Sequence, residues 1–178
     1  WERALAVVAH PDDLEYGGAA AIARWTRAGC RVAYVLATKG EAGIDSMEPE
    51  EAARVRMAEQ RDSAAVVGVD ELVYGLALRR DIAAAIRRHR PELVVAVNHR
   101  ETYGGMYLNM ADHRVCGQAT IDAVRDAANR WVFTDLRDAG LEPWGGVRHM
   151  AVIASPQPTH AVDVTETFDL GVESLRRH

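Results

Sequence analysis

The chain has 178 residues, of which 48% are hydrophobic and 26% are charged, a composition that is typical of globular domains. This composition excludes a disordered tail protein and a fibrous repeat. The net charge of -5 at pH 7 gives no general electrostatic attraction toward nucleic acid or an anionic membrane surface. We therefore expect one domain over residues 1–178 and no nucleic-acid partner.

The hydropathy pattern predicts neither a membrane-spanning segment nor a secretory signal peptide. The longest apolar runs, such as residues 93–97, are far shorter than the roughly 20 residues that cross a bilayer. The two cysteines, Cys30 and Cys116, lie far apart in apolar or helical surroundings. This argues against a disulfide scaffold and against a cysteine zinc knuckle, and it predicts a reducing compartment, the cytoplasm.

The first half of the chain alternates between strand and helix patterns. Residues 4–9 form an unbroken apolar run, as in strands that are covered on both faces, and residues 19–29 have helical spacing that ends in glycine. Residues 31–38 are predicted as the second strand, parallel to the first and reached by a right-handed crossover. Proline and glutamate then open a long helix over residues 49–67.

The second half continues this alternation. Its predicted strands cover residues 69–74, 93–98, 149–154 and 161–164, and its predicted helices cover residues 78–89, 112–128 and the end of the chain. On the helix over residues 78–89, four arginines are expected to face outward: Arg79, Arg80, Arg87 and Arg88. The sequence predicts an α/β fold, a three-layer α/β/α sandwich with a mainly parallel, Rossmann-like sheet.

Three ionisable residues, His10, Asp12 and Asp13, follow the first predicted strand directly. In open parallel sheets, ligands bind beyond the carboxyl ends of the strands, near the point where the strand order reverses. Pro11 restricts the backbone so that His10 and Asp13, three residues apart, converge on one point. An imidazole and a carboxylate suit zinc, and a catalytic zinc takes three protein ligands and keeps a position for water.

The best candidate for the third ligand is His113, at the start of the helix after the fourth strand. That helix start lies at the same edge of the sheet as His10 and Asp13. The neighbouring Asp112 is expected to orient a ligand or a base. Asp12 then stays uncoordinated, placed to take a proton from zinc-bound water. This arrangement favours a metal-dependent hydrolase.

The segment Ala-His-Pro-Asp-Asp over residues 9–13, together with Asp112-His113-Arg114 leading into Gly117, resembles the PIG-L/LmbE zinc-dependent N-deacetylases. The resemblance covers most of the chain. Members of this family remove acetyl groups from N-acetylglucosamine units, and a minority cleave related amides. The resemblance implies a hydrolase that deacetylates an N-acetylglucosamine-containing small molecule or glycoconjugate.

The resemblance also implies individual roles. It implies that His10, Asp13 and His113 bind zinc, and that Asp12 is the general base for the zinc-bound water that attacks the amide. It further implies that Arg56 contacts the substrate. A substrate pocket for the polar sugar is expected from five residues: Arg56, His99, Arg100, Tyr103 and Tyr107.

Met110 departs from the family's His-Pro-Asp-His motif, because it replaces a histidine that helps to stabilise the oxyanion. A thioether cannot donate a strong hydrogen bond. We expect His160 to take this catalytic role, with Tyr107 and His99 in reserve, since several members place a late histidine in the site. Some supply it from a neighbouring subunit, so a homo-oligomer is among the expected states. The family's Asp-Gly loop after the third strand is also missing, since only residues 75–77 stand there.

Three other functions compete with the deacetylase. A Rossmann-type cofactor binder needs the motif Gly-x-Gly-x-x-Gly after the first strand. This chain has His-Pro-Asp-Asp over residues 10–13 instead, which argues against a cofactor binder. A non-catalytic zinc- or sugar-binding member of the fold stays open because of Met110, and turnover with zinc present would distinguish it. An amidase acting on a thiol conjugate would share every metal residue and differ only in its substrate pocket.

Overall fold

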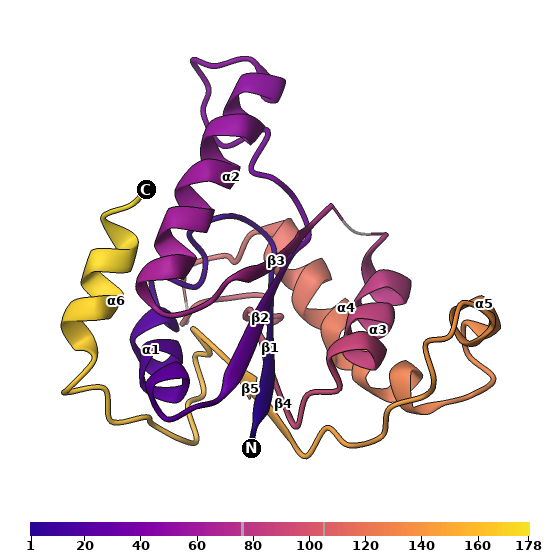
Figure 1. Cartoon of the computed structure of the whole chain (residues 1–178). Coiled ribbons are helices and arrows are strands. Elements are labelled where there is room, and N and C mark those ends of the chain that lie inside the picture. Colours follow the sequence, from indigo (N-terminus) through magenta and orange to yellow (C-terminus); the bar gives the residue numbers. More distant parts are fainter. Residues whose placement is uncertain (76, 105) are drawn as a thin grey trace.

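The centre of the computed structural model, which describes residues 1–75, 77–104 and 106–178, is a five-stranded sheet (Figure 1). Its strands are β1 (Arg3–Val8), β2 (Arg31–Leu36), β3 (Glu71–Tyr74), β4 (Leu93–Ala96) and β5 (His149–Val152). They lie in the order β3-β2-β1-β4-β5, and neighbouring strands are parallel. The predicted α/β class and the parallel, Rossmann-like sheet are confirmed.

The two central strands are apolar along almost their whole length because both faces of the sheet are covered. On β1, Leu5, Val7 and Val8 are fully buried, and Tyr34 and Val35 of β2 are buried beside them. Burying a Val or Leu side chain stabilises a fold by about 1.5–3 kcal/mol. These strands therefore form the core on which the loops at their carboxyl ends are held.

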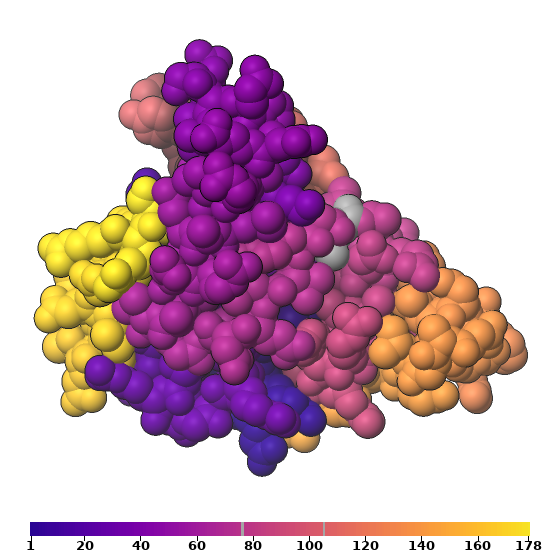
Figure 2. Space-filling view, turned by 45° about the horizontal axis from the view of Figure 1, so that its top comes forward, coloured from indigo at the N-terminus to yellow at the C-terminus, as the bar shows by residue number. Residues whose placement is uncertain are grey.

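Helices cover the sheet on both sides. They are α1 (Ala19–Arg27), α2 (Pro49–Val66), α3 (Leu78–His89), α4 (Ala111–Ala128), α5 (Thr134–Asp138) and α6 (Phe168–Leu175). α6 packs against α1 and α2 on one face, and α3 packs against α4 on the other (Figure 1). Figure 2 shows the α6 segment (yellow) and the α5 segment (orange) on opposite sides of the molecule. Within the described residues, no helix is long and apolar enough to cross a membrane.

The strand order reverses between β1 and β4. The chain passes outward from β1 to β2 and β3, and α3 then returns it to β4 on the other side of β1. The carboxyl ends of β1 and β4 are therefore neighbours at a topological switch point, the usual ligand site of open α/β sheets. His10 follows β1, and the loop over residues 97–110 leads from β4 into α4.

Two local predictions were wrong. Residues 161–164 form no strand, because this segment runs along α1, where the Arg24 guanidinium donates to the carbonyl of Asp163. Arg87 does not face outward: it is 3% exposed, and its guanidinium donates to backbone carbonyls at the end of α4, including that of Asn129 at 2.8 Å. The last carbonyls of a helix lack partners within the helix, and Arg87 supplies donors for them. Leu76, in the short connection after β3, lies outside the described residues.

Candidate metal centre

The chain leaves β1 in a tight turn that carries three of the predicted site residues. The Oδ2 atom of Asp13 accepts the backbone N–H groups of Ala9 and His10 at 3.0 and 2.8 Å, so the carboxylate is fastened to its own turn. Asp12 has a left-handed backbone with φ of 85°. Such a conformation costs a non-glycine residue about 1–3 kcal/mol, so neighbouring contacts must hold it in place.

Helix α4 approaches the end of β4 closely enough to place His113 beside this turn. A Cβ atom on Gly117 would lie 2.5 Å from the carbonyl oxygen of Val97, so a glycine is needed for this packing. His113 lies four residues before Gly117 and therefore on the same face of α4. The close approach at Gly117 thus directs His113 toward the carboxyl ends of β1 and β4.

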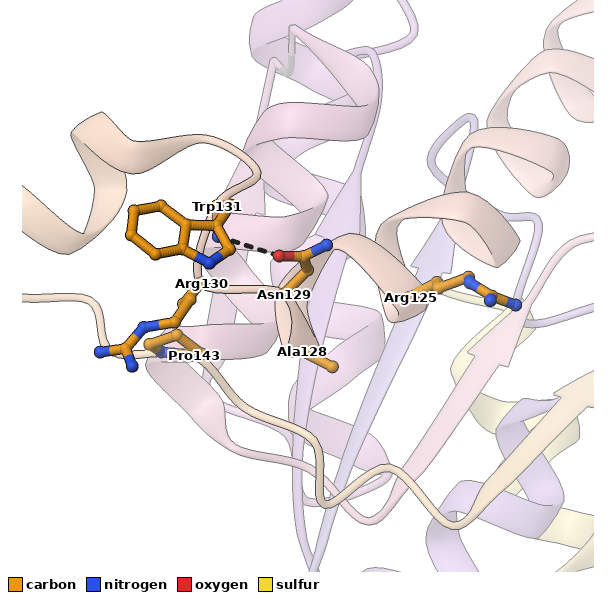
Figure 3. A pocket seen from close by; sticks show the side chains of 6 residues that line it. All are labelled: Arg125, Ala128, Asn129, Arg130, Trp131 and Pro143. Atoms are coloured by element: carbon orange, nitrogen blue, oxygen red, sulfur yellow. Dashed lines mark hydrogen bonds between the residues drawn. The ribbon is translucent and has the colours of Figure 1, made fainter.

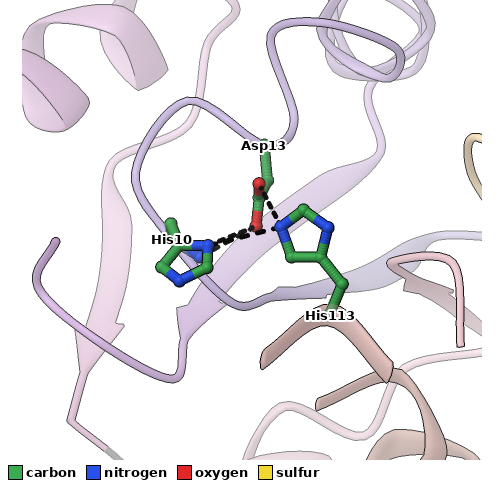
Figure 4. A group of neighbouring side chains, drawn as sticks. All are labelled: His10, Asp13 and His113. Carbon is green, nitrogen blue, oxygen red and sulfur yellow. Dashed lines mark hydrogen bonds and ion pairs between the residues drawn. The ribbon is translucent and has the colours of Figure 1, made fainter. Parts of the chain in front are cut away.

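Two imidazoles and one carboxylate point toward one another in the resulting cluster (Figure 4). The Nε2 atom of His113 lies 3.0 Å from Oδ1 of Asp13 and 3.3 Å from Nδ1 of His10. Nδ1 of His10 lies 3.7 Å from Oδ2 of Asp13. One ligand atom from each of the three residues lies within 4.8 Å of the others, so the group could hold a metal ion.

The spacing of these atoms fits a small divalent cation. Ligand atoms around a tetrahedral zinc with bonds of 2.0–2.1 Å are about 3.3 Å apart, close to the separations in the cluster. The outward nitrogens of both imidazoles have partners of their own: His10 Nε2 donates to Asp112 Oδ2 at 3.0 Å, and His113 Nδ1 faces Asn109 Oδ1 at 3.2 Å. Metal-binding histidines are usually held in this way.

The cluster also has a marked charge distribution. Hydrogen bonding to Asp13 raises the pKa of His10 against the opposing effect of burial, and Asp112 adds to the rise. Burial disfavours the charged form of Asp13, yet hydrogen bonds from His10 and His113 hold the pKa of this carboxyl well below its usual range. The carboxylate of Asp13 therefore stays ionised, which suits a cation at this position.

Asp12, in the same turn after β1, bonds a side chain of α2. Its Oδ2 atom accepts from Nη2 of Arg56 at 2.7 Å, and the same nitrogen donates to the Pro11 carbonyl at 2.7 Å. The backbone N–H of Asp12 donates to Oε1 of Gln60 at 3.0 Å. The sequence reasoning missed Gln60, although its spacing of four residues from Arg56 on a helix places both on one face and could have identified it.

The loop between β4 and α4 carries four residues predicted to bind substrate. Tyr103 places its hydroxyl against Nδ1 of His113, so it contacts a cluster residue directly. Burial and the charge of Asp13 raise the pKa of Tyr103, which keeps the phenol neutral. Arg100 and Tyr107 are exposed, and His99 is half-buried. Asn109, buried at the base of this loop, was missed, because only the folded path of the loop brings it to His113.

Two residues concern the predicted hydrogen-bond donor to the oxyanion: His160, which was expected to supply it, and Met110, which cannot. His160 is exposed on the segment between β5 and α6, and its Nδ1 atom hydrogen-bonds Oγ1 of Thr159 at 2.9 Å. Its catalytic role stays a prediction. Met110 stands at the N-cap position of α4, with an exposed side chain next to Ala111 and Asp112.

A surface hollow lies at the opposite end of α4 (Figure 3). It is lined by Arg125, Ala128, Asn129, Arg130, Trp131 and Pro143. Arg125 and His113 are about 18 Å apart along the helix axis at 1.5 Å per residue. The hollow is therefore separate from the metal cluster.

Comparison with known proteins gives a family and a fold. Residues 5–124 match the model of the PIG-L family, described as GlcNAc-PI de-N-acetylase. A curated relative, the diacetylchitobiose deacetylase of Thermococcus kodakarensis, is 30% identical over an alignment of 193 positions that covers 99% of this chain and 69% of the relative. These matches confirm the family predicted from the sequence.

Solved structures agree with this assignment. The N,N'-diacetylchitobiose deacetylase of Pyrococcus horikoshii, complexed with its inhibitor MPG, matches with a TM-score of 0.90 and 25% identity, over 99% of this chain and 69% of that one. GalB, the 4-carboxy-2-hydroxymuconate hydratase of Pseudomonas putida, shares the fold with a TM-score of 0.77 and 18% identity, over 99% of this chain and 78% of that one.

Proposed function

The chain belongs to the PIG-L family, and on that premise we propose that it is a zinc-dependent N-deacetylase acting on an N-acetylglucosamine-containing small molecule or glycoconjugate. The observation that carries the proposal is the convergence of His10, Asp13 and His113 at the switch point of the sheet, next to Asp12. The relative from Thermococcus kodakarensis, a diacetylchitobiose deacetylase, supports the amide of an amino sugar as the bond that is cleaved.

The donor set supports zinc as the metal, since two imidazoles and one carboxylate leave a coordination position open. The ligand atoms would be Nδ1 of His10, Oδ1 of Asp13 and Nε2 of His113, the atoms that face one another in the cluster. Zinc bound there supplies a Lewis acid for the amide carbonyl and lowers the pKa of a water molecule from 15.7 to roughly 7. The protein holds these ligands through Asp112 and Asn109.

Asp12 is the general base in this proposal. It takes a proton from the water whose oxygen bonds to the carbonyl carbon, and it returns that proton to the nitrogen as the carbon–nitrogen bond breaks. The amine leaves with that proton, and the second proton of the water leaves on acetic acid, which ionises to acetate in solution, so atoms and protons balance. A well-placed general base contributes about 10²–10⁴-fold to the rate. Arg56 and Gln60 hold the carboxylate and the backbone of Asp12 for this task.

Stabilisation of the oxyanion needs a further hydrogen-bond donor, because Met110 cannot supply one. We assign this role to His160, whose segment must approach the metal centre of its own or a neighbouring copy to fulfil it. The loss of one oxyanion donor lowers kcat by about 10²–10³-fold. A protein in which nothing replaces the missing histidine is therefore expected to be a slow enzyme.

The sugar is proposed to bind against the loop after β4, where polar and aromatic side chains surround the metal centre. The residues predicted from the sequence for this contact are Arg56, His99, Arg100, Tyr103 and Tyr107. Tyr103 is the best supported of them, because its hydroxyl already lies beside His113. Arg56 serves Asp12 and not the sugar in this proposal, because Asp12 and the Pro11 carbonyl occupy Nη2 of its guanidinium.

A second candidate is a binding module that holds zinc or sugar without catalysis, and the observation that favours it is Met110 in place of a histidine. The shared fold of a hydratase also shows that this architecture does not fix the reaction. An amidase for a thiol conjugate would use the same metal residues.

The test measures free amine released from N-acetylglucosamine, N,N'-diacetylchitobiose and an amide of a thiol conjugate. The zinc-loaded protein is compared with a chelated sample and with Asp12→Asn. We expect amine from an acetylated sugar only when both zinc and Asp12 are present. Bound zinc without any amine would indicate the binding module, and amine from the thiol conjugate alone would indicate the amidase.

A further inference from the structure

The outward nitrogen of His113, Nδ1, has two polar neighbours. The Oδ1 atom of Asn109 lies 3.2 Å away, and the hydroxyl of Tyr103 approaches from the loop. Asn109 is 2% exposed, whereas Tyr103 is 38% exposed. The two neighbours differ in chemistry as well, because an amide oxygen only accepts a hydrogen bond, whereas a hydroxyl accepts or donates one.

The direction of the Asn109 amide follows from its other contacts. Its Nδ2 atom donates to the carbonyl oxygen of Asn98 at 2.6 Å and to that of Arg100 at 2.9 Å. A flipped amide would place its oxygen between these two carbonyl oxygens, with no proton to share. The two carbonyls therefore turn the amide oxygen of Asn109 toward His113.

Acceptors face both ring nitrogens of His113, since Oδ1 of Asp13 lies 3.0 Å from Nε2. When Nε2 binds a metal ion through its lone pair, the single proton of the neutral imidazole lies on Nδ1, where the amide oxygen of Asn109 accepts it. We propose that Asn109 is a positioning residue that fixes the tautomer and ring orientation of His113 for metal binding.

The corresponding contact of His10 fixes its ring less firmly. The Nε2 atom of His10 donates to Asp112, whose side chain is 61% exposed, so water competes for this hydrogen bond. The amide of Asn109 is enclosed and held by two carbonyls, so it lacks this competition. The inference rests on the metal centre of the proposed function, but it concerns metal affinity and does not require turnover.

The test measures the zinc dissociation constant of metal-free protein by competition with a chromogenic chelator. We expect Asn109→Leu to weaken zinc binding by about 10–100-fold, the usual effect of removing such a partner of a metal ligand. Tyr103→Phe removes the other neighbour of Nδ1 and should change the constant by less than about threefold, because a hydroxyl does not decide the tautomer. In the zinc-loaded protein, the Nδ1 proton of His113 should exchange with water faster in Asn109→Leu.

Asn98→Leu is the matched control. Asn98 is buried in the same loop, where its side chain bonds the carbonyl of Thr102 and the N–H of Arg100 without touching His113. Asn98→Leu therefore measures any loss of zinc affinity that comes from disturbing the loop without changing the partner of His113. Equal weakening in Asn98→Leu and Asn109→Leu, or none in Asn109→Leu, would overturn the inference, as would strong weakening in Tyr103→Phe.

A second variant protects the test against misfolding of Asn109→Leu. Asn109→Asp keeps an acceptor oxygen toward Nδ1, although its second oxygen meets the carbonyls of Asn98 and Arg100. In the folded variant, as judged by circular dichroism, we expect the zinc affinity to be closer to that of the wild type than to that of Asn109→Leu. Weakening of more than about tenfold in Asn109→Asp, with Asn98→Leu unchanged, would contradict the inference. A protein that binds zinc in this pattern and deacetylates nothing would refute the proposed function and leave the role of Asn109 standing.

Discussion

Arg56 holds Asp12: its Nη2 atom lies 2.7 Å from Oδ2 of Asp12, and the same nitrogen donates to the Pro11 carbonyl. Both acceptors belong to the turn after β1. The Arg56 side chain is 16% exposed, so little of it is free to meet a substrate. The residue that the family resemblance assigns to substrate contact therefore positions the proposed base.

Replacing Arg56 should separate these two roles. Because Arg56→Ala frees the carboxylate of Asp12 to move, we expect kcat to fall about 100-fold, as misplacement by about 1 Å does elsewhere. KM should change by less than about threefold, since substrate binding itself is retained. Arg56→Lys keeps the charge but not the planar guanidinium and should be intermediate. A several-fold rise in KM at unchanged kcat would return Arg56 to substrate binding.

Gln60 of α2 also bonds the turn after β1. It accepts the N–H of Asp12 at 3.0 Å and donates to the buried carboxylate of Glu15 at 2.9 Å. Gln60→Leu leaves both groups without this partner, so we expect the free energy of unfolding to fall by about 1–3 kcal/mol. Urea unfolding measures this loss, and kcat should fall with it. Gln118→Leu, at an exposed site on α4, is the control. Equal stability and kcat in both variants would refute this role.

Gly117 tests the approach of α4 to the sheet. The methyl group of Gly117→Ala would meet the Val97 carbonyl at 2.5 Å, so the helix must move and His113 with it. We expect a loss of about 1–3 kcal/mol of stability, despite the better helix propensity of alanine, together with weaker zinc binding. Gly145→Ala is the control, since its methyl group would lie 3.7 Å from Cβ of Ala128, an ordinary contact. Unchanged zinc affinity in Gly117→Ala would contradict this account.

Periodicity and position predicted the architecture and the cluster. The apolar run of β1 indicated a strand covered on both faces, and the placement of residues 10–13 and His113 at the ends of parallel strands brought them to one edge. The short helix α5 (Thr134–Asp138) was not predicted, because five residues are too few to show a helical period. It begins after Phe133, whose left-handed backbone with φ of 52° cannot be predicted from the sequence pattern.

The features that the sequence predicted wrongly, or did not predict, depend on tertiary contacts. Arg87 has the spacing of a surface residue, but the end of α4 lies over it and offers carbonyl acceptors. Residues 161–164 alternate as a strand would, but they lie along α1. Asn109 stands among exposed side chains in the sequence, and only the path of its loop turns it toward His113.

Arg87 should matter for stability and not for chemistry. Arg87→Met removes donors from the carbonyls of Asp126 and Ala127, in buried hydrogen bonds at the end of α4, and from part-buried carbonyls just after it. A buried carbonyl costs about 1 kcal/mol or more when unpaired, so we expect a loss of at least about 2 kcal/mol. Thermal and urea unfolding measure it. The neighbouring, exposed Arg88 provides the control variant Arg88→Met, which should be near neutral. A kcat that drops in folded Arg87→Met would show that the two ends of α4 are coupled.

The central claim is that one metal ion, held by His10, Asp13 and His113, enables Asp12 to drive amide hydrolysis. The most direct measurement is acetate release from N,N'-diacetylchitobiose while metal-free protein is titrated with zinc. We predict that the rate rises in proportion to added zinc, levels off at one zinc per chain, and stays at background in His113→Ala and Asp12→Asn. Acetate release by the metal-free protein, or by either variant at the wild-type rate, would contradict the account.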